Sequence, residues 1–82
     1  MQPTPQTDMT GSGDPADSQL ADFATKVREF RKTRGLSQAL LAENAGLDRK
    51  TISRIENSRY SPSLTSLFAI ADALDVEPKE LL

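Results

Sequence analysis

The stretch that most constrains this chain is residues 37–57, SQALLAENAGLDRKTISRIEN. Ser37 and Asp48 are each followed by a short run of helix-forming sequence, and both are residue types that favour helix N-caps. Between them, Gly46 can adopt the positive φ that ends a helix in a tight turn. The pattern therefore predicts two short helices joined by the turn at 45–48, and we expect them at about residues 38–45 and 49–57.

The second of these helices has two distinct sides. At about 100° per residue, its polar residues fall within an arc of about 140°; they are Arg49, Lys50, Ser53, Arg54 and Asn57. A short helix with one polar, basic side is typical of a helix that enters the major groove of DNA. Glu56 falls on the opposite, apolar side, where an unpaired carboxylate is costly. It therefore needs a cationic partner, and Arg31 is the best candidate.

The rest of the sequence predicts further helices around this unit. Apolar residues recur with helical spacing along about 19–34 and again along about 64–74, and Pro78 begins a short fifth helix that ends at Leu82. Because no strand pattern is present, the predicted fold class is all-α. Residues 1–18 are rich in Pro, Thr, Gly, Ser and Asp, so we expect a disordered acidic tail before a single domain at 19–82.

Composition excludes several kinds of chemistry. The 82 residues include no Cys and no His, which argues against disulfides, the usual zinc ligands and the commonest general base. Asp72 and Asp75 are one turn apart but have no obvious metal-binding partners, and we interpret them as solvated charges. No apolar run is long enough for a membrane span, and the N-terminus does not resemble a signal peptide. We expect a soluble cytoplasmic protein that is not an enzyme, uses no cofactor and binds no metal or small molecule.

Charge is distributed unevenly along the chain, whose net charge is −2. Residues 1–22 hold four Asp and no Lys or Arg, whereas residues 23–59 hold nine Lys and Arg against four Asp and Glu. Residues 60–82 return to one Lys against four Asp and Glu. The basic block therefore coincides with the predicted polar helix face. Such a block can be a solvated surface, but here it also suits an anionic partner.

These features together resemble one family. Leu-Ser-Gln-x-x-Leu-Ala at 36–42, Gly-Leu at 46–47 and Thr-Ile-Ser-x-Ile-Glu-Asn at 51–57 occur in order. With the apolar pattern from Phe23 to Leu82, they are similar to the Cro/lambda-repressor-like (Xre-type) helix-turn-helix family, a compact five-helix DNA-binding fold. The family usually has Gly where Ser58 stands. Within the family, the chain looks similar to restriction-modification controller proteins and small phage-type repressors.

The resemblance implies roles for individual residues. The base-reading positions of the family are matched by Arg49, Lys50, Ser53 and Arg54. Ser53 could instead allow the helix to approach the DNA closely, and Lys50 and Arg54 could instead bind phosphate. Gln38 matches a position that contacts a phosphate or braces the reading helix. The remaining phosphate-contacting positions are matched by Ser37, Asn57, Arg59 and Tyr60. Arg31 and Glu56 match a partly buried ion pair. Arg28, Lys32 and Arg34 are left as a solvated or steering surface.

The apolar C-terminal residues have two interpretations. They could be internal core, or they could form a homodimer interface comprising Phe68, Leu74, Val76, Leu81 and Leu82. We favour the dimer, because the predicted helix at 64–74 carries more apolar surface than a small bundle needs to bury. Two-fold symmetry would then set two reading helices about one DNA turn apart on a roughly palindromic operator. The predicted function is a sequence-specific transcriptional regulator of double-stranded DNA, associated with the nucleoid when bound, which could repress or could activate by contacting RNA polymerase. The alternative is an antitoxin-like protein-interaction module that also binds DNA, with residues 1–22 folding on its partner.

Overall fold

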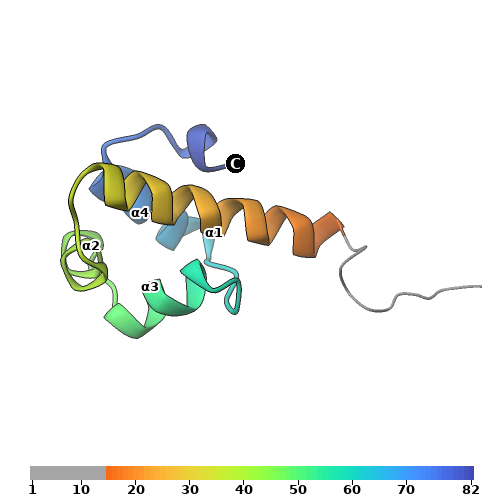
Figure 1. Cartoon of the computed structure of the whole chain (residues 1–82), viewed down its shortest axis with the longest axis horizontal. Helices are drawn as coiled ribbons and strands as arrows, with labels where there is room; N and C mark the ends of the chain where they lie inside the picture. Colours follow the sequence, from red (N-terminus) through yellow and green to blue (C-terminus); the bar gives the residue numbers. More distant parts are fainter. Residues whose placement is uncertain (1–14) are drawn as a thin grey trace, which may run out of the picture.

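Four α-helices and one 3-10 helix make up the described part of the chain (Figure 1). The computed structural model describes residues 15–82, with side chains from Ser18 onward. The elements are α1 (Pro15–Thr33), α2 (Gln38–Ala45), α3 (Arg49–Glu56), α4 (Leu64–Leu74) and the 3-10 helix η1 (Pro78–Leu81). The all-α prediction is confirmed, but the count of five helices is not, because the last element is a single 3-10 turn. In this part of the chain no helix is both long and apolar enough to span a bilayer.

The predicted boundaries agree with the structure to within one residue, except at the start of α1. The bounds of α2 and α4 are as predicted, whereas α3 ends at Glu56, one residue early. α1 begins at Pro15, so residues 15–18 are helical and not part of a disordered tail. Proline suits this first turn because its φ is already helical and its missing N–H has no partner to lose. The predicted disorder of residues 1–14 lies outside the described residues.

Local capping explains where two of the helices start. The hydroxyl of Ser37 accepts a hydrogen bond from the backbone N–H of Leu40 at 3.0 Å, and that of Ser63 accepts one from Ser66 at 3.1 Å. Asp48 occupies the corresponding position before α3 with extended backbone, but its carboxylate makes no capping hydrogen bond. The predicted Ser cap of α2 is therefore confirmed, Ser63 caps α4 in the same way, and Asp48 is an N-cap by position alone.

All four α-helices end in the same backbone motif. In each, the residue in the left-handed region donates its N–H three residues back, and the next residue donates five residues back. This is the Schellman arrangement. Gly35 and Gly46 adopt the left-handed φ after α1 and α2, at 69° and 71°, which confirms the prediction for Gly46. After α3 and α4, however, the same conformation is held by Ser58 and Asp75, at φ values of 60° and 59°.

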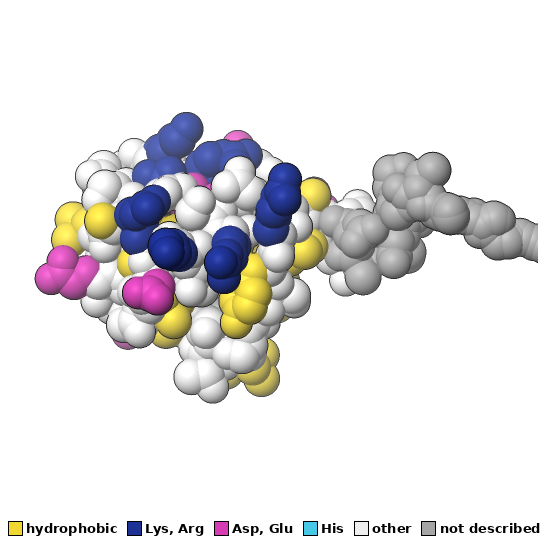
Figure 2. All heavy atoms as spheres, turned by 90° about the horizontal axis from the view of Figure 1, so that it is seen from below, with side chains coloured by type: hydrophobic (Ala, Val, Ile, Leu, Met, Phe, Trp, Pro, Cys, Tyr) yellow, Lys and Arg dark blue, Asp and Glu magenta, His cyan; other side chains and the backbone are white. Residues whose placement is uncertain are grey.

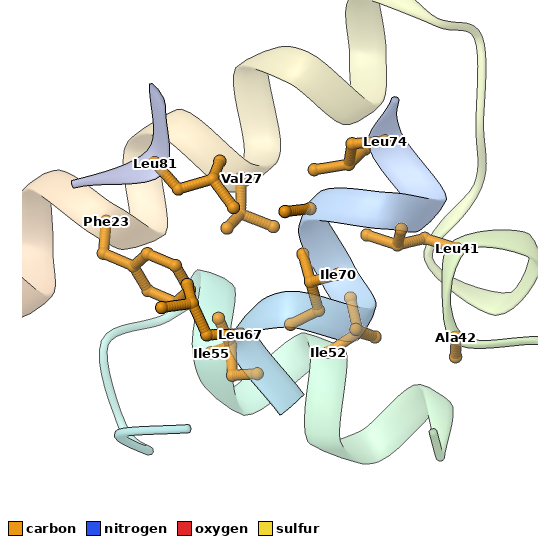
Figure 3. Close-up of a cluster of buried hydrophobic side chains, with 11 residues drawn as sticks. Phe23, Val27, Leu41, Ala42, Ile52, Ile55, Leu67, Ile70, Leu74 and Leu81 are labelled. Carbon is orange, nitrogen blue, oxygen red and sulfur yellow. The ribbon is translucent and has the colours of Figure 1, made fainter. Parts of the chain in front are cut away.

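A single apolar core joins the elements (Figure 3). The fully buried large side chains come from every one of them: Val27, Leu41, Ile52, Ile55, Ile70, Leu74 and Leu81. η1 returns beside α1, so that Leu81 lies over Val27 in the core (Figure 3). Because Leu74 and Leu81 have 0% of their surface exposed, they belong to this core. The prediction that they form a dimer interface is wrong, since neither offers surface to a partner.

Candidate nucleic-acid interface

α3 presents one face to solvent and the other to the core. Arg49, Lys50 and Arg54 are exposed and Ser53 is half-buried, while Ile52 and Ile55 are completely buried. This separation follows from the 3.6-residue period, which places the two isoleucines one turn apart on the side opposite the basic residues. The division of α3 that the sequence predicts is therefore present in the structure.

The exposed side of α3 lies within a wider basic surface. Figure 2 shows the molecule from the side on which α3 lies in Figure 1, and Lys and Arg side chains gather across this face. Acidic side chains lie mainly toward its edge. Among the side chains from residue 18 onward, Arg49, Lys50 and Arg54 take part in no ion pair, because the one salt bridge in this part of the chain lies elsewhere. Their charged groups are thus available to an anionic partner.

The inner end of α3 is anchored through Glu56, which is only 4% exposed. Arg31 of α1 forms a two-pronged ion pair with its carboxylate, with Nε–Oε2 at 2.6 Å and Nη2–Oε1 at 3.0 Å. Gln38 at the start of α2 donates from Nε2 to the same Oε1 at 3.1 Å. The remaining Nη1 of Arg31 donates to the carbonyl of Leu36 at 2.8 Å. The carboxylate that the sequence places on the apolar side of α3 is therefore paired with Arg31 and hydrogen-bonded at both oxygens, which offsets the cost of burying it.

This pairing also affects the titration of Arg31. The hydrogen bond to Glu56 raises the pKa of Arg31 above its ordinary value, and the charge of Glu56 adds to that effect, while partial burial opposes it. Because the pKa is raised, Arg31 remains charged at every pH at which the protein would be studied. The ion pair therefore cannot be lost through deprotonation of Arg31 under ordinary conditions.

The predicted phosphate-contacting residues surround the ends of α2 and α3. Ser37, Asn57, Arg59 and Tyr60 are all exposed. Asn57 uses its side-chain amide to donate to the carbonyl of Ser53 at 2.8 Å. Gln38 differs, because its amide is directed to Glu56. Of the two roles that the family resemblance allows Gln38, the structure shows bracing of α3.

Comparison with known proteins places this geometry in a family. A profile of helix-turn-helix proteins (HTH_3) matches residues 27–81, which extend from the second half of α1 to η1. The chain belongs to the helix-turn-helix family. The resemblance to Cro/lambda-repressor-like, Xre-type proteins that the sequence indicates is thereby confirmed.

Relatives of this helix-turn-helix protein are regulators by name. It is 51% identical to an HTH-type transcriptional regulator of Methanothermobacter thermautotrophicus over 53 residues, covering 65% of this chain and 77% of the relative. It is 44% identical over 52 residues to the immunity repressor of Bacillus phage phi105, covering 63% of this chain. The matched region is only 36% of that repressor's length.

A solved structure of similar size matches nearly throughout. The restriction-modification controller protein C.AhdI from Aeromonas hydrophila superposes with a TM-score of 0.77 at 40% identity. The match covers 79% of this helix-turn-helix protein and 98% of C.AhdI. The described domain therefore has the same fold as C.AhdI.

Three large apolar side chains remain on the surface near the C-terminal elements. Leu64 is 65% exposed, Phe68 is 50% exposed and Leu82 is 73% exposed. Leu64 and Phe68 are one turn apart on α4, so they share a face. Leu64 and Leu82 line one shallow hollow, of about 260 Å³, together with α1 residues that include Leu20 and Phe23. Val76 is half-buried against the core. Leu64 is the surface residue that the predicted interface omits, although its i, i+4 spacing from Phe68 was visible in the sequence.

The structure also changes the interpretation of α1's basic residues. Arg28, which the sequence leaves on a solvated surface, is partly buried and donates from Nη1 to the backbone carbonyl of Glu56 at 3.0 Å. Arg34 lies over the ring of Phe30, with its guanidinium carbon 5.2 Å from the ring centre. Arg28 lies three residues before Arg31, on the same side of α1. That spacing is the signal that could have placed both arginines beside α3.

Proposed function

We propose that this protein is a sequence-specific regulator of transcription that inserts α3 into the major groove of double-stranded DNA. The observation that carries the proposal is the division of α3 into two faces. Its outer face is basic and forms no ion pair among the described residues, and its inner face is fixed by two buried isoleucines and Glu56. A reading helix needs both properties, because base contacts specify sequence only when the helix is held at a defined position. The regulatory relatives named above support the same function.

Each residue of the outer face has a chemical role in this proposal. Arg49, in the first turn of α3, is suited to a bidentate contact with O6 and N7 of guanine. Lys50 and Arg54 read bases or bind adjacent phosphates, and Ser53 permits close approach of the helix to the base edges. Phosphates are bound from the ends of α2 and α3, where the exposed candidates are Ser37, Asn57, Arg59 and Tyr60. Gln38 supports them by bracing α3.

The test is selection of bound DNA from a random pool, followed by salt titration of wild type and Arg49→Ala. Loss of Arg49 should cost about 1–3 kcal/mol and relax the preference at one base pair. Lys79→Ala in η1 removes the same charge away from α3 and is the matched control. An equal loss of affinity for every sequence would show that Arg49 binds phosphate, and failure of the wild type to enrich any sequence would refute specific binding.

We further propose that the protein acts as a homodimer through a C-terminal apolar surface consisting of Leu64, Phe68, Val76 and Leu82. Three of these side chains are at least half exposed, which is unusual for large apolar residues grouped on a small domain. A two-fold dimer would use this surface twice and would read a roughly palindromic site. Covering promoter DNA would repress transcription, and contact with RNA polymerase beside it would activate.

Sedimentation analysis of Phe68→Asp tests the dimer. A buried carboxylate at a two-fold interface would face its own copy, so the variant should be monomeric at concentrations at which the wild type is dimeric. Leu40→Asp is the control, because Leu40 is also an exposed apolar residue, 41% accessible, but lies on α2. If both variants keep the wild-type mass, the interface lies elsewhere on the surface.

A further inference from the structure

The C-terminal end of α3 is more completely bonded than the end of any other described helix. The last four carbonyls of an α-helix have no partner within the helix. In α3, those of residues 53, 54 and 55 accept backbone N–H groups of residues 57, 59 and 58, at 3.0, 2.8 and 3.1 Å. The final carbonyl, that of Glu56, accepts Nη1 of Arg28 at 3.0 Å. Among the described side chains, Arg28 is the one that binds the final carbonyl of an α-helix.

Glu56 is therefore held in two different ways. Arg31 and Gln38 bind its side-chain carboxylate, at 2.6 to 3.1 Å. A glutamate side chain has several rotatable bonds, so these contacts alone leave the helix backbone some freedom to move. Arg28 instead binds the main chain itself. Its positive charge also lies at the negative end of the α3 dipole, where a cation is favoured.

The opposite end of α3 is fixed independently of Arg28. It follows directly from the turn after α2, in which the N–H of Leu47 donates to the carbonyl of Ala42 at 2.8 Å. The backbone N–H groups of Thr51 and Ile52 donate to the carbonyl of Asp48, at 3.0 and 3.2 Å, and close the first turn of α3. Release of the Arg28 contact would remove the hydrogen bond by which α1 holds the backbone at the C-terminal end of α3, so this end could shift as far as the side-chain contacts of Ile55 and Glu56 allow, while the N-terminal end would keep its contacts. Arg54 lies near the C-terminal end and Arg49 at the N-terminal end, about 7.5 Å apart along the axis.

We propose that Arg28 is a positioning residue that sets the angle of α3 and thereby the base preference at the Arg54 end of the reading helix. This inference rests on the proposed function, in which α3 reads the major groove, and takes Arg54 in the base-reading role that this function allows it. It gives α1 a role in specificity, although Arg28 itself need not contact a base. Loss of the Arg28 contact should change base preference more at the Arg54 end of α3 than at the Arg49 end, whereas a general loss of folding would weaken both ends equally.

The experiment compares base preferences selected from a random DNA pool by wild type, Arg28→Met, Arg28→Lys and Lys32→Met. Methionine keeps an apolar stem of similar length but removes the donor and the charge. Lys32→Met is the matched control, because Lys32 is an exposed cation one turn away on α1 and no side-chain hydrogen bond holds it among the described residues. Thermal unfolding establishes the temperature at which all four proteins are equally folded before selection.

Arg28→Met should lower the preference at the base pair read by Arg54 about fivefold, as expected for one misplaced hydrogen bond. Preference at the Arg49 base pair should be retained. Lys32→Met should reduce overall affinity through its charge but keep both preferences, and Arg28→Lys should restore part of the Arg54 preference because it can donate to the same carbonyl. If Arg28→Met does not fold, the base preferences of Arg28→Lys are compared with those of Lys32→Met instead.

Two results would overturn the inference. One is an Arg28→Met profile that matches that of Lys32→Met, and the other is an equal loss at all base pairs. Either result would mean that Arg28 acts only through its charge or through the stability of the fold. Failure of the proposed function is distinguishable, because the wild type itself would then enrich no sequence.

Discussion

Replacement of Ser58 by glycine should stabilise this protein, because Ser58 holds a conformation that favours glycine. It ends α3 at φ 60°, whereas the equivalent positions after α1 and α2 are Gly35 and Gly46, at 69° and 71°. A left-handed residue with a side chain costs about 1–2 kcal/mol. Glycine removes that cost but adds about 0.4–1 kcal/mol of unfolded-state entropy. The net gain in the free energy of unfolding should be about 0.8 kcal/mol.

The assay is thermal unfolding followed by circular dichroism, with urea unfolding as a second measurement. For a domain of this size, 0.8 kcal/mol corresponds to a rise in Tm of about 3–6 °C. The dependence of the unfolding free energy on urea should not change, because the surface exposed on unfolding is the same. The backbone bonds of the turn, at 3.1 and 2.8 Å to residues 55 and 54, do not involve the serine side chain and should be kept.

Gly35→Ser provides the matched reverse substitution. Gly35 occupies the same place in the same motif, and a Cβ added there would meet no atom within 4 Å. Its cost should therefore come from the backbone alone, about 0.8 kcal/mol of destabilisation. The reasoning is refuted if Gly35→Ser has this cost while Ser58→Gly gives no gain. That result would mean that the Ser58 side chain contributes stability of its own.

Three further predictions concern the core and the ion pair. Arg31→Met should destabilise by about 3 kcal/mol or more in urea unfolding, because it leaves the buried carboxylate of Glu56 without its cation; a cost below about 1 kcal/mol would contradict this. Since the pKa of Arg31 is raised in the folded protein, the stability that its charge contributes is present below the unfolded-state pKa. It is lost only as pH rises through the still higher folded-state pKa. The difference in unfolding free energy between wild type and Arg31→Met should therefore stay constant between about pH 7 and 10. Leu74→Ala should lower the unfolding free energy by about 3–5 kcal/mol, because Leu74 is completely buried. Phe68→Ala, measured on dilute protein, should lower it much less because Phe68 is half exposed, and similar losses for the two variants would argue against the assigned core.

Local sequence determined most of the helical framework of this protein. The ends of α2 depend on Ser37 and Gly46, which act within one turn of the chain, and both were predictable. The two sides of α3 follow from helical period alone, and so did the need of Glu56 for a cation. These features were accessible because each is decided by residues close together in sequence.

Tertiary structure decided which of several suitable residues fill each role. Leu74 and Leu81 have the same apolar character as Phe68 and Leu82, and only packing separates the buried pair from the exposed pair. Helical pattern cannot make that distinction, since the return of η1 against α1 buries Leu81 and leaves Leu82 outside.

The basic residues of α1 show the same limit. Arg28 and Arg31 lie on one side of α1, yet Arg31 meets the carboxylate of Glu56 and Arg28 meets its backbone carbonyl. The sequence cannot indicate which backbone carbonyl accepts such a hydrogen bond, because every residue carries one. The stretch at residues 37–57 therefore predicted its own two helices and its basic face, but how α1 holds that face in place depends on contacts between residues 25 to 28 positions apart.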